Sequence, residues 1–313
     1  MAFSYINRNS LWGTNGQTFY TSLMNDLATV SGWAIWDSSQ ISAAQPYFVM
    51  KVTTDEGVGN EMYFKIGIFT TNTQLIQAST FDGWNATTHV PTGNYLSNWY
   101  VHVGNTNSFI ASSSATYRIS GDQNAVVLTF TGLDSYIGMP MYLGGIEKLY
   151  NTTIDPALRC CFVLGEYIGS DPGTQQGIAQ QSTDNRLVFL NDATQAYGGR
   201  GIILHQTPMN FQTNYVRQLT GGPWYGDRTY FSARPLVYDN IFGPRGQLRH
   251  IEEMSNDDGI SGLNNLDTVT IKGQQFYTWN PSMIGDTGMA QYNNWNNRVD
   301  AASTKLLYLI RSA

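Results

Sequence analysis

Short runs of β-favouring residues, separated by turn-forming residues, recur through most of this 313-residue chain. The runs 46–53 and 61–70 are joined by Asp-Glu-Gly-Val-Gly-Asn, whose two glycines permit a chain reversal. The runs 116–120 and 125–132 are joined by the turn residues Gly-Asp-Gln-Asn. Extended runs on either side of such turns are typical of antiparallel hairpins, so we expect two hairpins in the first half of the chain.

The last third has the same character. Its clearest β-type runs are 233–240, 246–254, 267–280 and 305–312. In the third run, apolar residues on both sides of Lys272-Gly273 predict a further small hairpin.

One early segment has a helical pattern instead. Four apolar residues share one helical face: Phe19, Leu23, Leu27 and Val30. Asn15 or Thr18 is the expected N-cap, and Gly32 is placed to end the helix.

These patterns predict a mainly β fold, with β-sandwich or barrel-like antiparallel domains and one or two short helices, including the N-terminal amphipathic helix. We expect an N-terminal β domain over 1–150 and a C-terminal β domain over 202–313. Between them, 151–201 is rich in Gln, Gly, Ser, Thr and Asp, and we interpret it as an insertion or inter-domain region.

The acidic balance of the chain argues against a nucleic-acid partner. Lys and Arg number 17 against 23 Asp and Glu, whereas phosphate binding needs a basic surface.

The longest apolar runs fall far short of the roughly 18–20 residues of a membrane span, and the first residues lack a secretory pattern. We therefore expect no membrane partner, and synthesis in a reducing cytoplasm with Cys160 and Cys161 as free thiols.

Motifs for catalysis, cofactors or metals are not found in the sequence. The histidines at 89, 102, 205 and 250 lack the spacing of zinc ligands. The segment 255–262 is either a turn or an imperfect calcium loop, and Gly198-Gly-Arg-Gly201 is either a flexible loop or an anion-binding nest. We predict no metal and no cofactor.

Paired carboxylates could serve a glycosidase without a short motif. Asp55, Glu56 and Glu61 surround one hairpin loop, where solvated turn residues are the simpler interpretation. Glu252 and Glu253 lie on a predicted strand, whose alternation sends neighbouring side chains to opposite faces. We predict that the protein is not an enzyme.

Two segments rich in aromatic and Asn residues, 94–100 and 291–297, suggest sugar binding. Trp99 and Trp295 could stack on sugar rings. The alternative is that these side chains anchor loops to the β core.

The excess of Arg over Lys and of Asp over Glu favours a role in protein–protein contact. The chain has 12 Arg to 5 Lys and 17 Asp to 6 Glu. Arg and aromatic residues are enriched in interface cores, where Lys and Glu are depleted, although a β-rich protein also lacks helix-favouring Glu and Lys. Arg245 and Arg249 are our candidate interface residues, because one guanidinium group can donate two parallel hydrogen bonds to carboxylate or carbonyl oxygens. Ordinary salt bridges are the alternative for both.

Several of these stretches together resemble structural proteins of tailed bacteriophage virions. They are the helix followed by Gly32-Trp33, the hairpin over 46–68, the segment 117–150, and the runs GPRGQLRHIEEM and DTVTIKGQQFYTW before an apolar final strand. They cover about half of the chain, and 151–201 matches nothing in that family. The resemblance implies β-sandwich or barrel domains, a symmetric oligomer and no catalytic residues.

From the resemblance and the composition, we expect a non-enzymatic structural subunit of a phage tail, in the baseplate or neck. Its partners would be other virion proteins and copies of itself, and it would enter the virion in the host cytoplasm. One alternative is a host-receptor or carbohydrate-binding tail component with a host glycan as ligand. Another is a capsid decoration protein.

Overall fold

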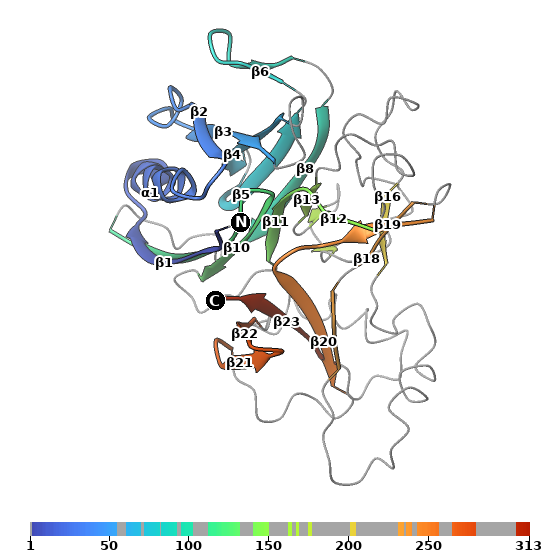
Figure 1. The fold of residues 1–313 in the computed structure, drawn as a ribbon. Coiled ribbons are helices and arrows are strands. Elements are labelled where there is room, and N and C mark those ends of the chain that lie inside the picture. The colour runs from blue at the N-terminus through green and yellow to red at the C-terminus, as the bar shows by residue number, and fades with distance from the viewer. Residues whose placement is uncertain are drawn as a thin grey trace, which may run out of the picture.

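The computed structural model is mainly β, as the sequence predicts, and its strands pair in antiparallel sheets (Figure 1). A 3₁₀ turn, η1 (Thr14–Gly16), leads into the helix α1 (Gln17–Leu27). The structure describes residues 2–54, 61–69, 72–81, 83–92, 95–102, 112–131, 140–149, 162–164, 167–168, 175–176, 201–204, 231–234, 236–239, 243–256, 265–279 and 305–313.

Two five-stranded sheets form a sandwich. The central sheet has the order β1 (Ser4–Leu11), β9 (Ser114–Gly121), β10 (Ala125–Thr131), β11 (Met141–Gly144) and β13 (Phe162–Leu164). The outer sheet has the order β2 (Trp33–Asp37), β3 (Tyr47–Thr53), β4 (Glu61–Phe69), β5 (Asn72–Phe81) and β8 (Tyr95–His102). Both hairpins expected in the first half are present, as β3–β4 and β9–β10.

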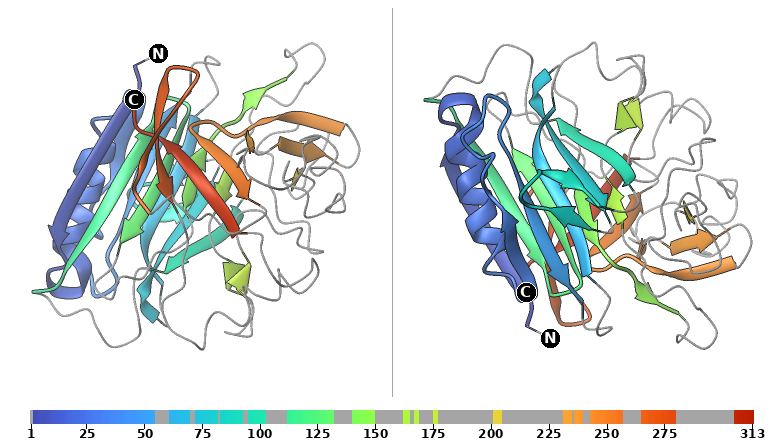
Figure 2. Two further views of the ribbon diagram at one scale, coloured as in Figure 1. Left: turned by 90° about the horizontal axis from the view of Figure 1, so that it is seen from below. Right: turned by 90° about the horizontal axis from the view of Figure 1, so that it is seen from above.

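The main core lies between these two sheets and the helix. Alternate residues of β4, including Phe64 and Ile66, face the same buried cluster as Tyr117 and Leu128 of the central sheet and Leu23 of α1. The helix runs along one side of the sandwich, beside β1 and β2 (Figure 2). Its buried face closes that side, which explains the apolar spacing seen in the sequence.

A third layer covers the other face of the central sheet. This C-terminal sheet has the order β17 (Phe231–Ala233), β20 (Ile251–Asn256), β23 (Lys305–Arg311), β22 (Gln274–Trp279) and β21 (Thr268–Ile271). Tyr277 bonds Thr129 of β10 across the layers, hydroxyl to hydroxyl at 3.0 Å, and Ser120 donates to the backbone carbonyl of Arg311. Residues 125–130 of β10 are therefore buried on both strand faces, as expected for a strand between two layers.

Smaller sheets complete the described structure. The side sheet has the order β12 (Glu147–Lys148), β19 (Gly243–Gln247), β18 (Leu236–Asp239) and β16 (Gly201–Leu204). Two-stranded pairs are formed by β6 (Trp84–Asn85) with β7 (Val90–Pro91), and by β14 (Tyr167–Ile168) with β15 (Gln175–Gln176). The division into 1–150, 151–201 and 202–313 stays a prediction, while strand pairs β11–β13 and β12–β19 cross its boundaries.

The helix has different ends from those expected. Its N-cap is Gly16, in a left-handed conformation and without a side-chain cap, rather than Asn15 or Thr18. It ends at Leu27, and Gly32 with φ +79° instead turns the chain into β2. A Cβ at Gly32 would lie 2.8 Å from the carbonyl oxygen of Thr53, so close backbone approach accounts for this glycine.

Two features of the last third matter for the site. The predicted hairpin at Lys272-Gly273 is confirmed, with φ of 51° and 79° at these residues, as a type I′ turn requires. The run 246–254 was expected to be one strand, but this is wrong. The run is divided between β19 and β20, which are separated by a bend. His250 has φ +61° at this bend.

Candidate functional site

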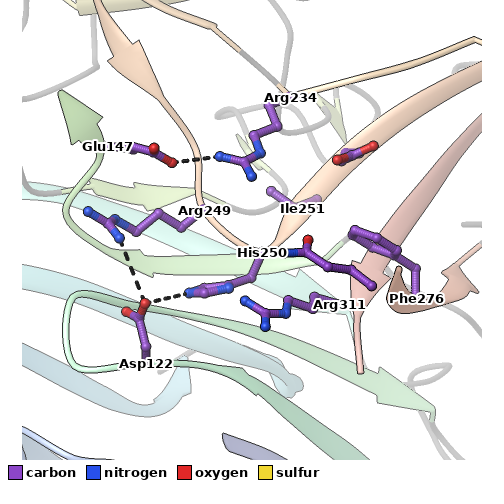
Figure 3. A pocket seen from close by; sticks show the side chains of 10 residues that line it. Asp122, Glu147, Arg234, Arg249, His250, Ile251, Phe276 and Arg311 are labelled. Atoms are coloured by element: carbon purple, nitrogen blue, oxygen red, sulfur yellow. Dashed lines mark hydrogen bonds and ion pairs between the residues drawn. The ribbon is translucent and has the colours of Figure 1, made fainter. Parts of the chain in front are cut away.

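A pocket of about 110 Å³ lies where the C-terminal sheet meets the turn between β9 and β10 (Figure 3). Its basic lining residues are Arg234, Arg249, His250 and Arg311. Its acidic lining residues are Asp122, Glu147 and Glu252, and Ile251 and Phe276 add apolar wall. The pocket therefore has a high density of charge for a chain in which only 13% of residues are charged.

The bend between β19 and β20 creates the basic side of this pocket. Leu248 and Ile251 are both buried, and their spacing of three residues cannot place them on one face of a regular strand. The chain turns between them, and the side chains of Arg249 and His250 line the pocket. The hydroxyl of Tyr142 holds the bend by accepting the backbone N–H of Arg249 at 3.2 Å.

Asp122 provides the acidic centre. Its Oδ1 accepts the backbone N–H of Asn124 at 2.8 Å, which fixes the β9–β10 turn. Its Oδ2 lies 3.1 Å from Nε2 of His250 and 3.7 Å from a terminal nitrogen of Arg249. Burial alone would raise the pKa of Asp122, but His250, the Asn124 N–H and Arg249 outweigh it and hold this pKa at about 2. The carboxylate is therefore ionised at neutral pH.

The other pocket charges divide into paired and unpaired groups. Arg234 donates to Glu147 at 2.6 Å, in the exposed part of the site. Arg311 lies over the ring of Phe3 at 4.2 Å and donates its Nε to the carbonyl oxygen of Ala313. Within the described ranges, neither Arg311 nor Glu252 forms an ion pair.

A second polar cluster surrounds Asp37 at the end of β2. This carboxylate accepts the indole N–H of Trp84 at 2.9 Å and the hydroxyl of Ser39 at 2.7 Å, and it lies 2.8 Å from Nδ1 of His89. Burial works to raise the pKa of Asp37, yet these hydrogen bonds hold it at about 2.

This cluster has the residue types of a Ser-His-Asp triad but not its geometry. A triad uses one imidazole nitrogen for the carboxylate and the other for the serine. Here Nδ1 of His89 faces both Asp37 and Ser39, the latter at 3.2 Å. The arrangement instead ties the β6–β7 hairpin to the end of β2.

The two candidate interface residues are placed differently. Arg249 lies in the pocket, with its side chain 19% exposed and Asp122 as its charged neighbour. Arg245 lies in β19, where the structure describes the backbone. The structure adds Asp122 and Arg311, which lie far from Arg249 in the sequence and carry no motif. The basic pair Arg249-His250 is a local sequence signal for this site.

Other sequence candidates fall partly within the structure. Glu61 pairs with Lys51 at 2.7 Å, while Asp55 and Glu56 lie outside the described residues. Glu252 and Glu253 are neighbours on β20, as expected, and Glu252 lines the pocket.

Most of the aromatic, cysteine and loop candidates lie outside the described residues. Trp99 lies in β8, where the structure describes the backbone. Trp295, Cys160 and Cys161 lie outside the described residues. So do 257–262 of the segment 255–262, a turn or an imperfect calcium loop, and 198–200 of the glycine-rich segment. His205 is outside as well.

Among the described residues, no group of three or more His, Cys, Asp or Glu side chains could hold a metal ion. Within the same ranges, no helix is long and apolar enough to cross a membrane. No known protein family matches the chain, and no curated protein matches it.

Proposed function

We propose that the protein is a non-enzymatic structural subunit of a tailed phage virion, acting in the tail, baseplate or neck through contacts with other virion proteins and with copies of itself. The observation that supports an assembly role is the exposed edge strand β1. Within the described residues, β1 pairs with β9 alone and forms an end of the central sheet.

The residues of β1 favour contact with another chain. Leu11 is 56% exposed and Tyr5 is 38% exposed, so both ends of the strand present large apolar groups. A free edge also presents unpaired backbone N–H and C=O groups, which are a template for another strand.

Charge on β1 does little to protect this edge. In natural edge strands, lysines, prolines or bulges prevent pairing with strands of other chains. The one charged residue of β1 is Arg8, and its guanidinium donates two hydrogen bonds to Asp26 of α1, at 2.5 and 2.7 Å. The positive charge is thereby balanced within the chain, and the edge stays open to a neutral or apolar partner strand.

The experiment is a measurement of mass in solution by light scattering, on the wild-type protein and on a Tyr5→Lys/Leu11→Lys variant. We expect a stable oligomer for the wild type and a smaller mass for the variant, because lysines on an edge oppose strand pairing. Val90→Lys is the matched control, since Val90 is exposed on the β6–β7 pair. A monomeric wild type, or a double variant with wild-type mass, would count against assembly through β1.

The phage role needs its own test. Antibody labelling of purified particles would locate the protein on the tail, baseplate or neck. Labelling spread over the head would favour a capsid decoration protein, and unlabelled particles would contradict a virion role.

One observation supports carbohydrate binding as a second candidate function. Trp36 is 42% exposed, yet its indole N–H donates to the carbonyl oxygen of Trp84 and Lys51 lies 4.9 Å from its ring centroid. An exposed ring held in a fixed orientation suits stacking against a sugar. Binding of host glycans by the wild type, lost in Trp36→Ala, would support this function over a purely structural one.

A further inference from the structure

Two basic side chains in the pocket, Arg249 and His250, each have a buried nitrogen without a hydrogen bond of good geometry. The side chain of Arg249 is 19% exposed, and its Nε is buried without a hydrogen-bond partner. Its contact with Asp122 is an ion pair at 3.7 Å, too long for a hydrogen bond. The side chain of His250 is 6% exposed, and its Nε2 also lacks a hydrogen bond of good geometry, although Asp122 is 3.1 Å away.

Arg311 completes this donor set from the opposite strand. Its Nε is used by the carbonyl oxygen of Ala313, and one face of its guanidinium is covered by Phe3. Its two terminal nitrogens have no carboxylate partner within the described part of the chain. Figure 3 shows Arg311 beside His250, on the same side of the pocket.

Buried donors without acceptors are costly, so such a site is expected to hold an acceptor from elsewhere. Guanidinium groups bind planar, two-oxygen anions through pairs of N–H donors. The pocket volume of about 110 Å³ has room for a small ionised group and its waters, but not for a nucleotide or a whole sugar.

The charge balance selects among small anions. The lining has three arginines and three carboxylates, so it is neutral overall when His250 is uncharged. A phosphate would add nearly two negative charges next to Asp122 and Glu252, whereas a carboxylate adds one, beside Arg249 and Arg311. Of these two anions, a carboxylate therefore meets less repulsion in the pocket.

The geometry points to a carboxylate-binding site formed by Arg249, His250 and Arg311. This inference goes beyond the proposed function, because a carboxylate could be bound whether or not the protein belongs to a virion. The carboxylate could come from a small free acid or from an Asp or Glu side chain of a neighbouring protein chain, and the experiment separates these sources.

The first arm measures binding of acetate to the full-length protein by calorimetry, at constant ionic strength, with chloride and phosphate as comparison anions. We expect acetate to bind more tightly than either. Arg249→Gln and Arg311→Gln should each weaken acetate binding about tenfold or more, since each removes charged donors. The control Lys272→Asn removes one positive charge from an exposed turn that favours Asn-Gly, and it should bind acetate as the wild type does.

The second arm follows mass by light scattering as acetate is added. A fall in mass with acetate, matched by a lower mass of Arg311→Gln without acetate, assigns the carboxylate to a neighbouring chain. Acetate binding at unchanged mass assigns it to a small free acid. Because Arg249→Gln removes a buried group and could disturb folding, Arg311→Gln and the wild-type anion ranking carry the test on their own.

The proposal is overturned if acetate neither binds nor changes the mass, and if Arg311→Gln keeps the wild-type mass. Preference for phosphate over acetate would also overturn it. Either result leaves the proposed assembly through β1 untouched, because the Tyr5 and Leu11 variants test that separately.

Discussion

The hydrogen bond between Thr129 and Tyr277 gives a direct test of the three-layer arrangement. The two hydroxyls are 3.0 Å apart, and both side chains are buried, at 0% and 4% exposure. Thr129 belongs to β10 of the central sheet and Tyr277 to β22 of the C-terminal sheet. Their bond therefore reports on contact between segments that are 148 residues apart in the sequence.

The perturbation is a double-mutant cycle with Thr129→Val and Tyr277→Phe. Each single change removes one hydroxyl and leaves its partner buried without a hydrogen bond, which costs about 1–3 kcal/mol of unfolding free energy. The double variant leaves neither hydroxyl behind, so it should lose only the net value of the bond, about 1 kcal/mol. The sum of the single effects should therefore exceed the double effect by about 1 kcal/mol or more.

The assay is equilibrium unfolding in denaturant, with Tyr20→Phe as the control. Tyr20 is fully buried in the main core, and its hydroxyl has no hydrogen-bond partner among the described residues. Its removal should cost nothing or should stabilise the protein. Additive single effects, within about 0.3 kcal/mol, would refute the reasoning, because they would mean that Tyr277 does not lie against β10.

Two further changes test local features. Because the pKa of Asp122 falls from 3.8 to about 2 on folding, this group adds about 2 kcal/mol of stability above pH 4. That stability should disappear as the pH falls towards 2, and Asp122→Asn should flatten the acid limb of a stability curve measured by denaturant unfolding. Gly32→Ala should lower the thermal unfolding temperature, because φ is +79° and the new Cβ would meet Gln123 at 2.5 Å and Thr53 at 2.8 Å. An unchanged acid limb, or an unchanged melting temperature, would contradict the respective assignment.

The hairpins could be predicted because their signals are local. In β4, apolar residues alternate from Met62 to Ile68, and the residues that precede the strand permit a turn, so pattern and turn chemistry agree. The helix was predicted equally well from its buried face, but its ends were not. Gly16 caps the helix through backbone conformation alone, and the sequence offered Asn15 and Thr18 as better side-chain caps.

The layer order and the pocket depend on contacts between distant segments, which a single sequence does not reveal. The run Ala125–Thr131 did not alternate, and burial on both faces is the physical reason. The spacing of Leu248 and Ile251 already conflicted with one continuous strand. That conflict was the available signal for the bend that brings Arg249 and His250 to Asp122.

Coverage of the sheet faces also indicates where a partner can bind. The central sheet is covered on both faces, and the outer sheet carries a second buried cluster that includes Trp84 of the β6–β7 pair. Among the described residues, two sheet edges stay exposed beside α1. They are the edge of β1, with Leu11, and the edge of β2, with Trp36. Both edges contact α1.

The exposed face of α1 between these edges is polar but uncharged. It includes Gln17, Thr18 and Asn25. Hydroxyl and amide groups cost less to remove from water than ions do, and they can bond to whatever covers them. Apolar groups on two open edges, separated by an uncharged helix face, therefore form a surface whose burial by another chain meets little electrostatic resistance. In the proposed assembly, the low Lys and Glu content of the chain would contribute by keeping this side free of charges that would have to be paired.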